Sequence, residues 1–550
     1  MAKTIYFNGD IITVNPNNDV VSGILTENGV ILAVGDEAEI LSLADENTRK
    51  IDLNGKTMLP GFIDPHGHLV AVAQTLLLLN FSACSSREEL VAFIQNRLKH
   101  NPPKEGEWII GFGYDNTKFA DQLHPTKFDL DAVSSEIPIF ISHASGHLAV
   151  ANSAALEKMG YVGTNYAVPQ GGIVRTVSPD SKEPNGILEE NACLDPEKKK
   201  AIPSPSAEDL IAAISKAQEL YAQYGITTAQ DASVDPNTHK LLLAAANAGQ
   251  LKIDIIGHAV QSSTFDLLKD EGTPRREYKN HYKLLGGKTW LDGSPQGKTA
   301  WLTQPYYKPP KGQKKDYCGY GTQTDQTVTA YFEGCIRRSL QVNVHVNGDA
   351  AADQFIRCYQ KALQKTGVQQ DLRPVMVHAQ TVREDQLDKM KTLGILPTFF
   401  LDHIWFWGDY HYESVLGPER ANAISPAASA LKRGIRFTLH QDPPVKMPNQ
   451  ILAIHNAVNR RTPKGRVLGE KQKISVMDAI RAVTINGAYQ SFEEELKGSI
   501  QKGKYADFVL LDRNPLKVEP AQIKKIQVLA TIKQDTILYQ KTASGASDGH

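Results

Sequence analysis

Both ends of the chain show the alternation of polar and β-branched residues that is typical of antiparallel strands. Residues 4–56 alternate short apolar runs with Asn-Gly and Gly-Asp turns, and residues 498–532 show a similar glycine-punctuated pattern. Such turns between alternating runs favour hairpins. Because terminal β segments that flank a different middle often pair with each other, we predict one small β-sandwich domain built from residues 1–58 and 489–550.

The middle of the chain alternates apolar runs with helical stretches, which is typical of βα units around a parallel sheet. Strands are predicted over residues 58–64, 226–230, 253–260, 284–291, 342–346, 375–379, 395–400 and 435–440. Helices are predicted over residues 207–224, 350–364, 383–393 and 419–433. Eight strands favour an α/β fold, a (β/α)₈ TIM-like barrel over residues 59–488. An open doubly wound sheet is the alternative, although no G-x-G-x-x-G follows the first strand.

A long segment separates the first predicted strand from the second. It spans far more residues than an ordinary βα connection and has a predicted helix over 86–100 and strand-like runs over 108–113 and 138–143. We interpret residues 75–205 as an inserted α+β lid subdomain. Because βα loops emerge at the catalytic mouth of such a barrel, we expect this subdomain to lie over the mouth.

Composition and charge exclude several classes of protein. The 550 residues carry 60 Lys+Arg against 61 Asp+Glu, a net charge of −1, which disfavours nucleic acid and anionic membranes as partners. No apolar run reaches the roughly 18 residues of a membrane span, and no secretory signal is found. The five cysteines are scattered. We therefore expect a cytoplasmic protein whose partner is a small-molecule substrate, and we leave a homodimer open.

A His-x-His pair ends the first predicted barrel strand. Residues two apart in an extended chain point to the same face, so His66 and His68 can present two imidazoles to one ion. A single His-x-His motif is by itself a weak signal of metal binding. It gains weight because His345 and His378 each end a later predicted strand, and Asp442 follows the eighth. Nitrogen and oxygen ligands without thiolate suit Zn²⁺, Mn²⁺, Fe²⁺ or Co²⁺.

These residues lie within longer segments that carry a family resemblance. The chain resembles the amidohydrolase superfamily, and within it the YtcJ-like branch of amidohydrolase family 3, and it is similar to N-substituted formamide deformylases. The segments that carry the resemblance are 60–68 (PGFIDPHGH), 142–147 (SHASGH), 152–156 (NSAAL), 288–294 (KTWLDGS), 344–345 with 347–349 (VH and NGD), and 502–509 (KGKYADFV). The resemblance spans nearly the whole chain.

The resemblance implies roles for individual residues. His66 and His68 would bind the more buried metal, and His345 and His378 would bind a second ion or help hold the substrate. Asp442 would contact the metal and its water and act as the general base. Lys288 stands where relatives can carry a carboxylated lysine that bridges two metals. We expect one or two divalent ions, with Zn²⁺ favoured over Mn²⁺, Fe²⁺ or Co²⁺.

Substrate contacts are predicted in two places. Tyr114, His143 and His147 lie in the insertion, and His403 lies in the unusually aromatic segment 399–407, which we interpret as core packing rather than as a wall for a flat substrate. One departure from the family pattern stands out. Relatives usually read Gly-Ser-Asp where this chain has an extra imidazole, His440, two residues before Asp442.

The predicted function is a metal-dependent hydrolase that cleaves an amide or formamide C–N bond other than a peptide bond. A divalent metal lowers the pKa of a bound water to about 7, so that metal-bound hydroxide can attack the carbonyl at neutral pH. Asp442 would take the proton of the water, and His378 or His345 would stabilise the oxyanion. A deaminase or lactonase on the same metal site stays open, as does a catalytically silent binding or regulatory protein.

Overall fold

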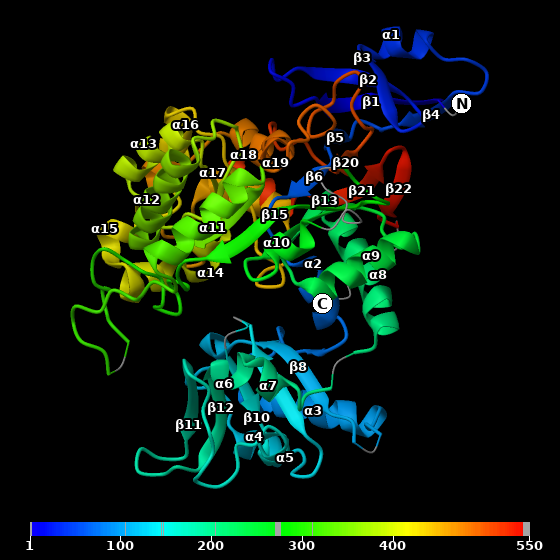
Figure 1. Cartoon of the computed structure of the whole chain (residues 1–550). Coiled ribbons are helices and arrows are strands. Elements are labelled where there is room, and N and C mark those ends of the chain that lie inside the picture. The colour runs from blue at the N-terminus through cyan, green and yellow to red at the C-terminus, as the bar shows by residue number, and fades with distance from the viewer. Residues whose placement is uncertain are drawn as a thin grey trace. The chain divides into compact units, whose positions relative to one another are not determined.

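A computed structural model describes residues 3–542, apart from residues 105, 145, 147, 204, 270–276 and 311. The chain divides into two compact units. Of the described residues, the first unit contains those up to Val70 and those from Ala217 to 542, and the second contains those within Ala71–Lys216 (Figure 1). The second unit overlaps the predicted insertion, while the predicted domain boundaries themselves stay predictions. Among the described residues, no helix has both the length and the apolar character that a membrane span needs.

The first unit contains an eight-stranded parallel sheet that forms a TIM-like barrel. Its strands pair in the order β19-β18-β17-β16-β15-β14-β13-β6. Their bounds are β6 Phe62–Asp64, β13 Ile226–Val234, β14 Asp254–Val260, β15 Tyr282–Trp290, β16 Gln341–Val346, β17 Val375–His378, β18 Leu396–Phe399 and β19 Thr438–Leu439. Each overlaps one predicted strand. Nearly every position of these strands is buried, as expected for parallel strands covered on both faces.

The two edge strands of the barrel sheet, β6 and β19, are not joined by a ladder but come together through the loops that follow them. The backbone N–H of His68 donates to the carbonyl of Pro443 at 2.9 Å. These loops carry His66 and Asp442, so the closure of the barrel brings residues from opposite ends of the sheet to one place.

Helices connect and cover the barrel strands. The longer ones of the first unit are α9 Pro236–Asn247, α11 Asp325–Arg337, α12 Asp349–Thr366, α13 Glu384–Leu393, α14 Asp402–Tyr410 and α17 Gln450–Asn459. The shorter ones are α10 Thr264–Leu267, α15 Gly417–Ala421, α16 Ala427–Lys432, α18 Val476–Ala482 and α19 Ile485–Gln490. Helix α1, Glu37–Ser42, packs instead on strands near the N-terminus. Helix α2 spans Leu69–Thr75, and α8 spans Ala207–Gln223, close to its predicted bounds.

One predicted helix is wrong. The pattern over 419–433 predicts a single helix, but α15 ends at Ala421 and α16 begins at Ala427. Pro426 lacks a backbone N–H and disfavours a helical conformation in the residue before it. Accordingly, Ser425 adopts a left-handed φ of 47°.

Strands from both ends of the chain share one further sheet in the first unit. Its bounds are β1 Lys3–Ile12, β2 Val20–Glu27, β3 Val30–Gly35, β4 Arg49–Asp52, β5 Thr57–Pro60, β20 Phe508–Leu511, β21 Val528–Lys533 and β22 Thr536–Gln540. The two ends meet where β20 pairs antiparallel with β5 (Figure 1). One side of this sheet buries a core that includes Tyr6, Ile24 and Phe508. The two ends therefore fold together, whereas the predicted sandwich arrangement stays a prediction.

The second unit has its own mixed sheet of six strands, in the order β11-β12-β10-β9-β8-β7. The strands are β7 Leu79–Asn80, β8 Ile109–Tyr114, β9 Ile139–His143, β10 Leu148–Ala151, β11 Gly172–Thr176 and β12 Pro184–Glu190. Its helices are α3 Arg87–His100, α4 Lys127–Asp131, α5 Ser153–Lys158, α6 Asn191–Leu194 and α7 Pro196–Lys199. The predicted helix and strands of the insertion coincide with α3, β8 and β9.

Candidate functional site

The six predicted metal residues gather at the carboxyl ends of the barrel strands. His66 and His68 follow β6, Lys288 lies near the end of β15, His345 lies in β16, His378 ends β17, and Asp442 follows β19. In a (β/α)₈ barrel, this is the end at which catalytic residues are found. Their separations along the sequence are large, so the site depends on formation of the whole sheet.

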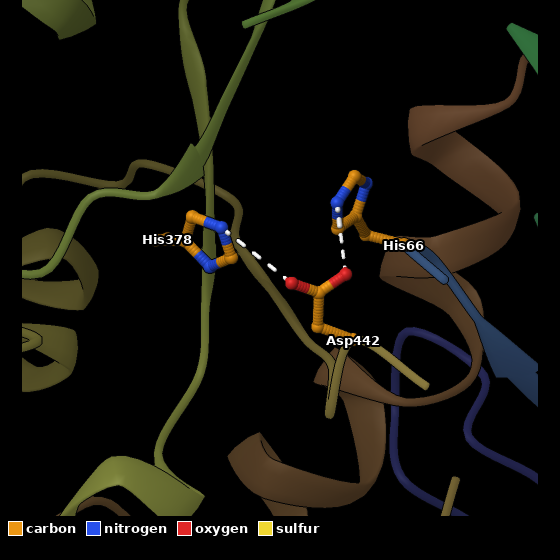
Figure 2. A group of neighbouring side chains, drawn as sticks. All are labelled: His66, His378 and Asp442. Atoms are coloured by element: carbon orange, nitrogen blue, oxygen red, sulfur yellow. Dashed lines mark ion pairs between the residues drawn. The ribbon is translucent and has the colours of Figure 1, made fainter. Parts of the chain in front are cut away.

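The carboxylate of Asp442 lies at the centre of the group. Its Oδ1 is 3.4 Å from Nε2 of His66 and 3.2 Å from Nε2 of His68. Its Oδ2 is 3.8 Å from Nε2 of His378 (Figure 2). One ligand atom each from His66, His378 and Asp442 lie within 4.8 Å of one another, and no second group of this kind occurs in the described part of the chain. This donor set fits a divalent metal ion.

The protonation states of these residues favour metal binding. Burial, together with the charge of Lys288, lowers the pKa of His66 well below its ordinary value. Burial and the neighbouring His345 do the same to the pKa of His378. Burial by itself would raise the pKa of Asp442, but the hydrogen bond and charge of His68 lower it below its ordinary value. These shifts favour neutral imidazoles at His66 and His378 and an ionised carboxylate at Asp442, the forms that bind metal.

Lys288 is buried beside another predicted metal residue, His66. Its side chain is 4% exposed, and its Nζ lies 3.4 Å from Nε2 of His66. Burial lowers the pKa of its ammonium group to about 8, against the opposing effect of Asp442. A lysine with this pKa has a neutral amine available near neutral pH.

His345 packs against His378, with ring centroids 4.5 Å apart. Its Nε2 lies 3.0 Å from the side-chain amide of Asn347. The loop after His345 is held by Asp292, whose carboxylate accepts the backbone N–H groups of Asn347 and Gly348 at 3.0 and 2.7 Å. His345 is therefore held beside His378, which in turn contacts Asp442.

The backbone is strained where two of these residues leave their strands. His378 has a φ of 71° and Asp442 a φ of 56°, both in the left-handed region that non-glycine residues rarely adopt. Such conformations persist only when the surrounding structure enforces them, and they cluster at functional sites. They direct the side chains of His378 and Asp442 toward each other.

The predicted substrate contacts fall in different parts of the molecule. The ring of His403, on α14, lies 6.2 Å from that of His378 and 4.2 Å from that of Phe400. Tyr114 and His143 belong to the second unit, where their rings lie 5.1 Å apart. His147 lies outside the described residues. The substrate-binding roles of all four stay predictions.

The structure adds buried carboxylates that the sequence analysis did not single out. Asp64 is fully buried, and burial raises the pKa of its carboxyl well above the ordinary value. Asp231 accepts the backbone N–H of Val70 at 2.8 Å and thereby ties β13 to the segment after His68. Asp64 stands inside the motif 60–68, and Asp231 directly follows a predicted strand, so both signals were present in the sequence.

Comparison with known proteins places the chain among relatives of similar length. A model of the amidohydrolase family matches residues 49–539. The chain is 26% identical to N-substituted formamide deformylase of Arthrobacter pascens, over 99% of this chain and 99% of that protein. It is 25% identical to YtcJ of Bacillus subtilis (strain 168), whose name assigns it to the amidohydrolases, over 98% of this chain and 100% of that protein.

A solved structure supports the same relationship. The crystal structure of an uncharacterized metal-dependent hydrolase from Pyrococcus furiosus superimposes with a TM-score of 0.74 at 26% identity. The match covers 94% of this chain and 100% of that one. This chain therefore shares its fold with a solved relative over almost its full length.

Proposed function

Because this chain belongs to the amidohydrolase family, we propose that it is a metal-dependent hydrolase of an amide or formamide C–N bond other than a peptide bond. The observation that carries the proposal is the contact of Asp442 with three imidazoles, those of His66, His68 and His378. The formamide deformylase of Arthrobacter pascens supports the substrate class.

In this proposal His66, His68 and Asp442 hold one divalent ion, with Zn²⁺ favoured by its nitrogen and oxygen ligands. His345 and His378 bind a second ion or hold the substrate. The relative from Pyrococcus furiosus, described as a metal-dependent hydrolase, supports a role for a metal in this protein as well. We further propose that Lys288 is carboxylated, which would convert a buried cation into an anionic oxygen ligand.

The residues of the site supply proton transfer and orientation. When bound, the ion lowers the pKa of water and polarises the scissile carbonyl. Asp442 takes a proton from the attacking water and returns it to the leaving amine. The imidazole of His345, or that of His378 where His378 holds the substrate rather than an ion, donates a hydrogen bond to the oxyanion. Tyr114, His143, His147 and His403 remain the proposed contacts to the rest of a small-molecule substrate.

Metal analysis and a substrate panel test the proposal together. Protein purified without chelator should contain about one equivalent or more of a transition metal, and chelation should abolish hydrolysis. The panel should contain N-formyl, N-acyl, cyclic-amide, lactone and aminoheterocycle substrates. Preferred turnover of N-formyl or N-acyl compounds supports the proposal. Turnover confined to lactones or aminoheterocycles would assign a different reaction to the same site. Protein that contains no bound metal would contradict the proposed metal-dependent function.

A further inference from the structure

Three buried side chains form a hydrogen-bonded chain that leads away from the metal residues. Nε2 of His440 lies 3.1 Å from Nδ1 of His378, and Nδ1 of His440 lies 3.0 Å from the hydroxyl oxygen of Thr398. His440 and Thr398 are completely buried and His378 is 3% exposed. The chain thus runs from β18 through the residue after β19 to the end of β17, and bulk water does not compete for these contacts.

We propose that His440 and Thr398 are positioning residues that fix the ring and the tautomer of His378 for metal binding. If Nε2 of His378 offers its lone pair to an ion, the proton of the neutral ring sits on Nδ1. His378 then donates from Nδ1 to Nε2 of His440, and His440 donates from its own Nδ1 to the hydroxyl of Thr398. This inference rests on the metal site of the proposed function.

The opposite direction of the chain has a different consequence. If the hydroxyl of Thr398 donated to His440, His440 would donate to His378, and Nε2 of His378 would carry a hydrogen and lose its lone pair. Nε2 is the atom of His378 that faces Oδ2 of Asp442, at 3.8 Å. The direction with His378 as donor is therefore the one that produces a ligand.

His378 needs such a partner because its backbone is strained and its ring is otherwise surrounded by other rings. Its φ of 71° places it in the left-handed region. The rings of Phe400 and His345 pack around it, with centroids 6.3 and 4.5 Å away. Ligating histidines commonly donate their second ring N–H to a carboxylate, carbonyl or water. Here another imidazole provides the acceptor.

Zinc affinity of the full-length protein tests the proposal. Metal-free wild type, His440→Phe and Thr398→Val are titrated with Zn²⁺ against a chromogenic chelator. Loss of such an outer partner typically weakens metal binding by about 10–100-fold, which is the expectation for His440→Phe. Because His440 and Thr398 act in one chain, the double variant should bind zinc no more weakly than His440→Phe alone. His440→Gln, which keeps an acceptor, should regain part of the affinity.

Thr438→Val is the matched control. Thr438 is a buried threonine on β19, in register with Thr398, and its hydroxyl donates to Gln490 rather than to a histidine. The Thr438→Val variant should bind zinc as tightly as wild type. If His440→Phe also binds zinc like wild type, the positioning role is rejected while the metal site stands. If wild type binds no zinc, the proposed function fails instead.

A spectroscopic readout decides the direction of the chain without metal or activity. The ¹⁵N shifts of histidine in the metal-free wild type distinguish a protonated ring nitrogen from one with a lone pair. We expect Nδ1 of His378 to be protonated and Nε2 to carry the lone pair. A hydrogen on Nε2 of His378 would overturn the proposal. This measurement also decides the matter if His440→Phe does not fold.

Discussion

Asp442 is the residue on which the proposed chemistry depends most. Its two oxygens contact different histidines, and in the proposed mechanism it is both a metal ligand and the base that takes a proton from water. General-base catalysis contributes about 10²–10⁴-fold to rate, and Asp442→Asn should lower kcat/KM by at least about 100-fold. Steady-state kinetics at saturating metal measure this effect. A variant with near-normal kcat/KM would show that Asp442 is not the base.

Asp402→Asn is the control for that variant. Asp402 is a buried aspartate at the start of α14, and its carboxylate accepts a hydrogen bond from Asn456 at 2.6 Å. Among the described residues, no hydrogen bond or ion pair joins the side chain of Asp402 to a predicted metal residue. We expect unchanged metal content and kcat/KM. Equal losses in both variants would point to general damage to the fold.

Lys288 gives a second prediction at the scale of single residues. A carbamate forms when the neutral amine attacks CO₂ and releases a proton, and burial lowers the pKa of Lys288 enough to provide that amine. Metal uptake by metal-free wild type should therefore increase with added bicarbonate. Lys288→Met should lose this dependence. Lys298 is another buried lysine, and its Nζ donates to the hydroxyl of Ser414. The control variant Lys298→Met should therefore retain the dependence on bicarbonate.

A bicarbonate effect of equal size in wild type and Lys288→Met would rule out a carbamate on Lys288. Metal uptake is measured by elemental analysis after gel filtration, because the carbamate itself is labile in acid and is lost in many intact-mass measurements.

The sequence predicted which candidate metal residues lie close together because each one stands at or near the end of an apolar run. His66, His345 and His378 share that position, and a parallel barrel converts it into a shared location. The link between Thr398 and His440 was beyond prediction. It depends on the ring orientation of His440 and on the register of β18 with β19, neither of which leaves a local signal.

At the scale of elements, Arg460 explains how the segment between α15 and α16 is held. Its guanidinium is completely buried and donates to the carbonyls of Ile424, Ser425 and Leu468 at 2.6–3.1 Å. These carbonyls belong to irregular backbone that lacks helical partners. Two of the three bonds, those to Ile424 and Ser425, therefore satisfy carbonyls in the break between α15 and α16.

Arg460→Lys should destabilise the protein, because an ammonium group cannot reach three separate carbonyls with the geometry of a guanidinium. Buried groups left unsatisfied cost about 1–3 kcal/mol each, so we expect a loss of about 2–4 kcal/mol in the free energy of unfolding. Denaturant titration followed by tryptophan fluorescence measures it. The neighbouring Arg461→Lys, an exposed arginine that donates to Gly465, should change stability by less than about 0.5 kcal/mol.

If Arg461→Lys proved as destabilising as Arg460→Lys, the buried fork would not be the cause.

The same segment shows why element boundaries were predicted less well than elements. Periodicity continues across the break from 419 to 433, and only Pro426 signals it locally. The partner that stabilises the break, Arg460, comes from a different part of the chain.

At the scale of the first unit, a buried ionic network joins the barrel to the sheet built from the chain ends. Asp254, at the start of β14, contacts the Nζ atoms of Lys497 and Lys533, the latter at 2.8 Å. Lys533, on β21, also contacts Asp507 at 2.9 Å, and Lys283 pairs with Glu493 at 2.8 Å. Three cations and three carboxylates are thus buried together without net charge.

Asp254→Asn tests how strongly this network supports the fold. It leaves Lys497 and Lys533 buried with one carboxylate fewer, and breaking a buried pair in this way costs about 3–5 kcal/mol. Asp266→Asn removes one side of an exposed pair with Lys269, whose side chains are 74% and 73% exposed, and should leave stability close to that of wild type. Chemical denaturation of the three proteins compares the two losses directly.

The double variant Asp254→Asn with Lys497→Met separates a charge effect from a packing effect. Removing a lysine together with the carboxylate restores the balance of buried charges, so its loss in stability should be smaller than the sum of the two single losses. Additive losses would indicate that the network acts only as packing. Because Asp254 is distant in sequence from Lys497, a coupled loss would show that their charges interact in the folded protein, where the barrel meets the sheet built from the chain ends.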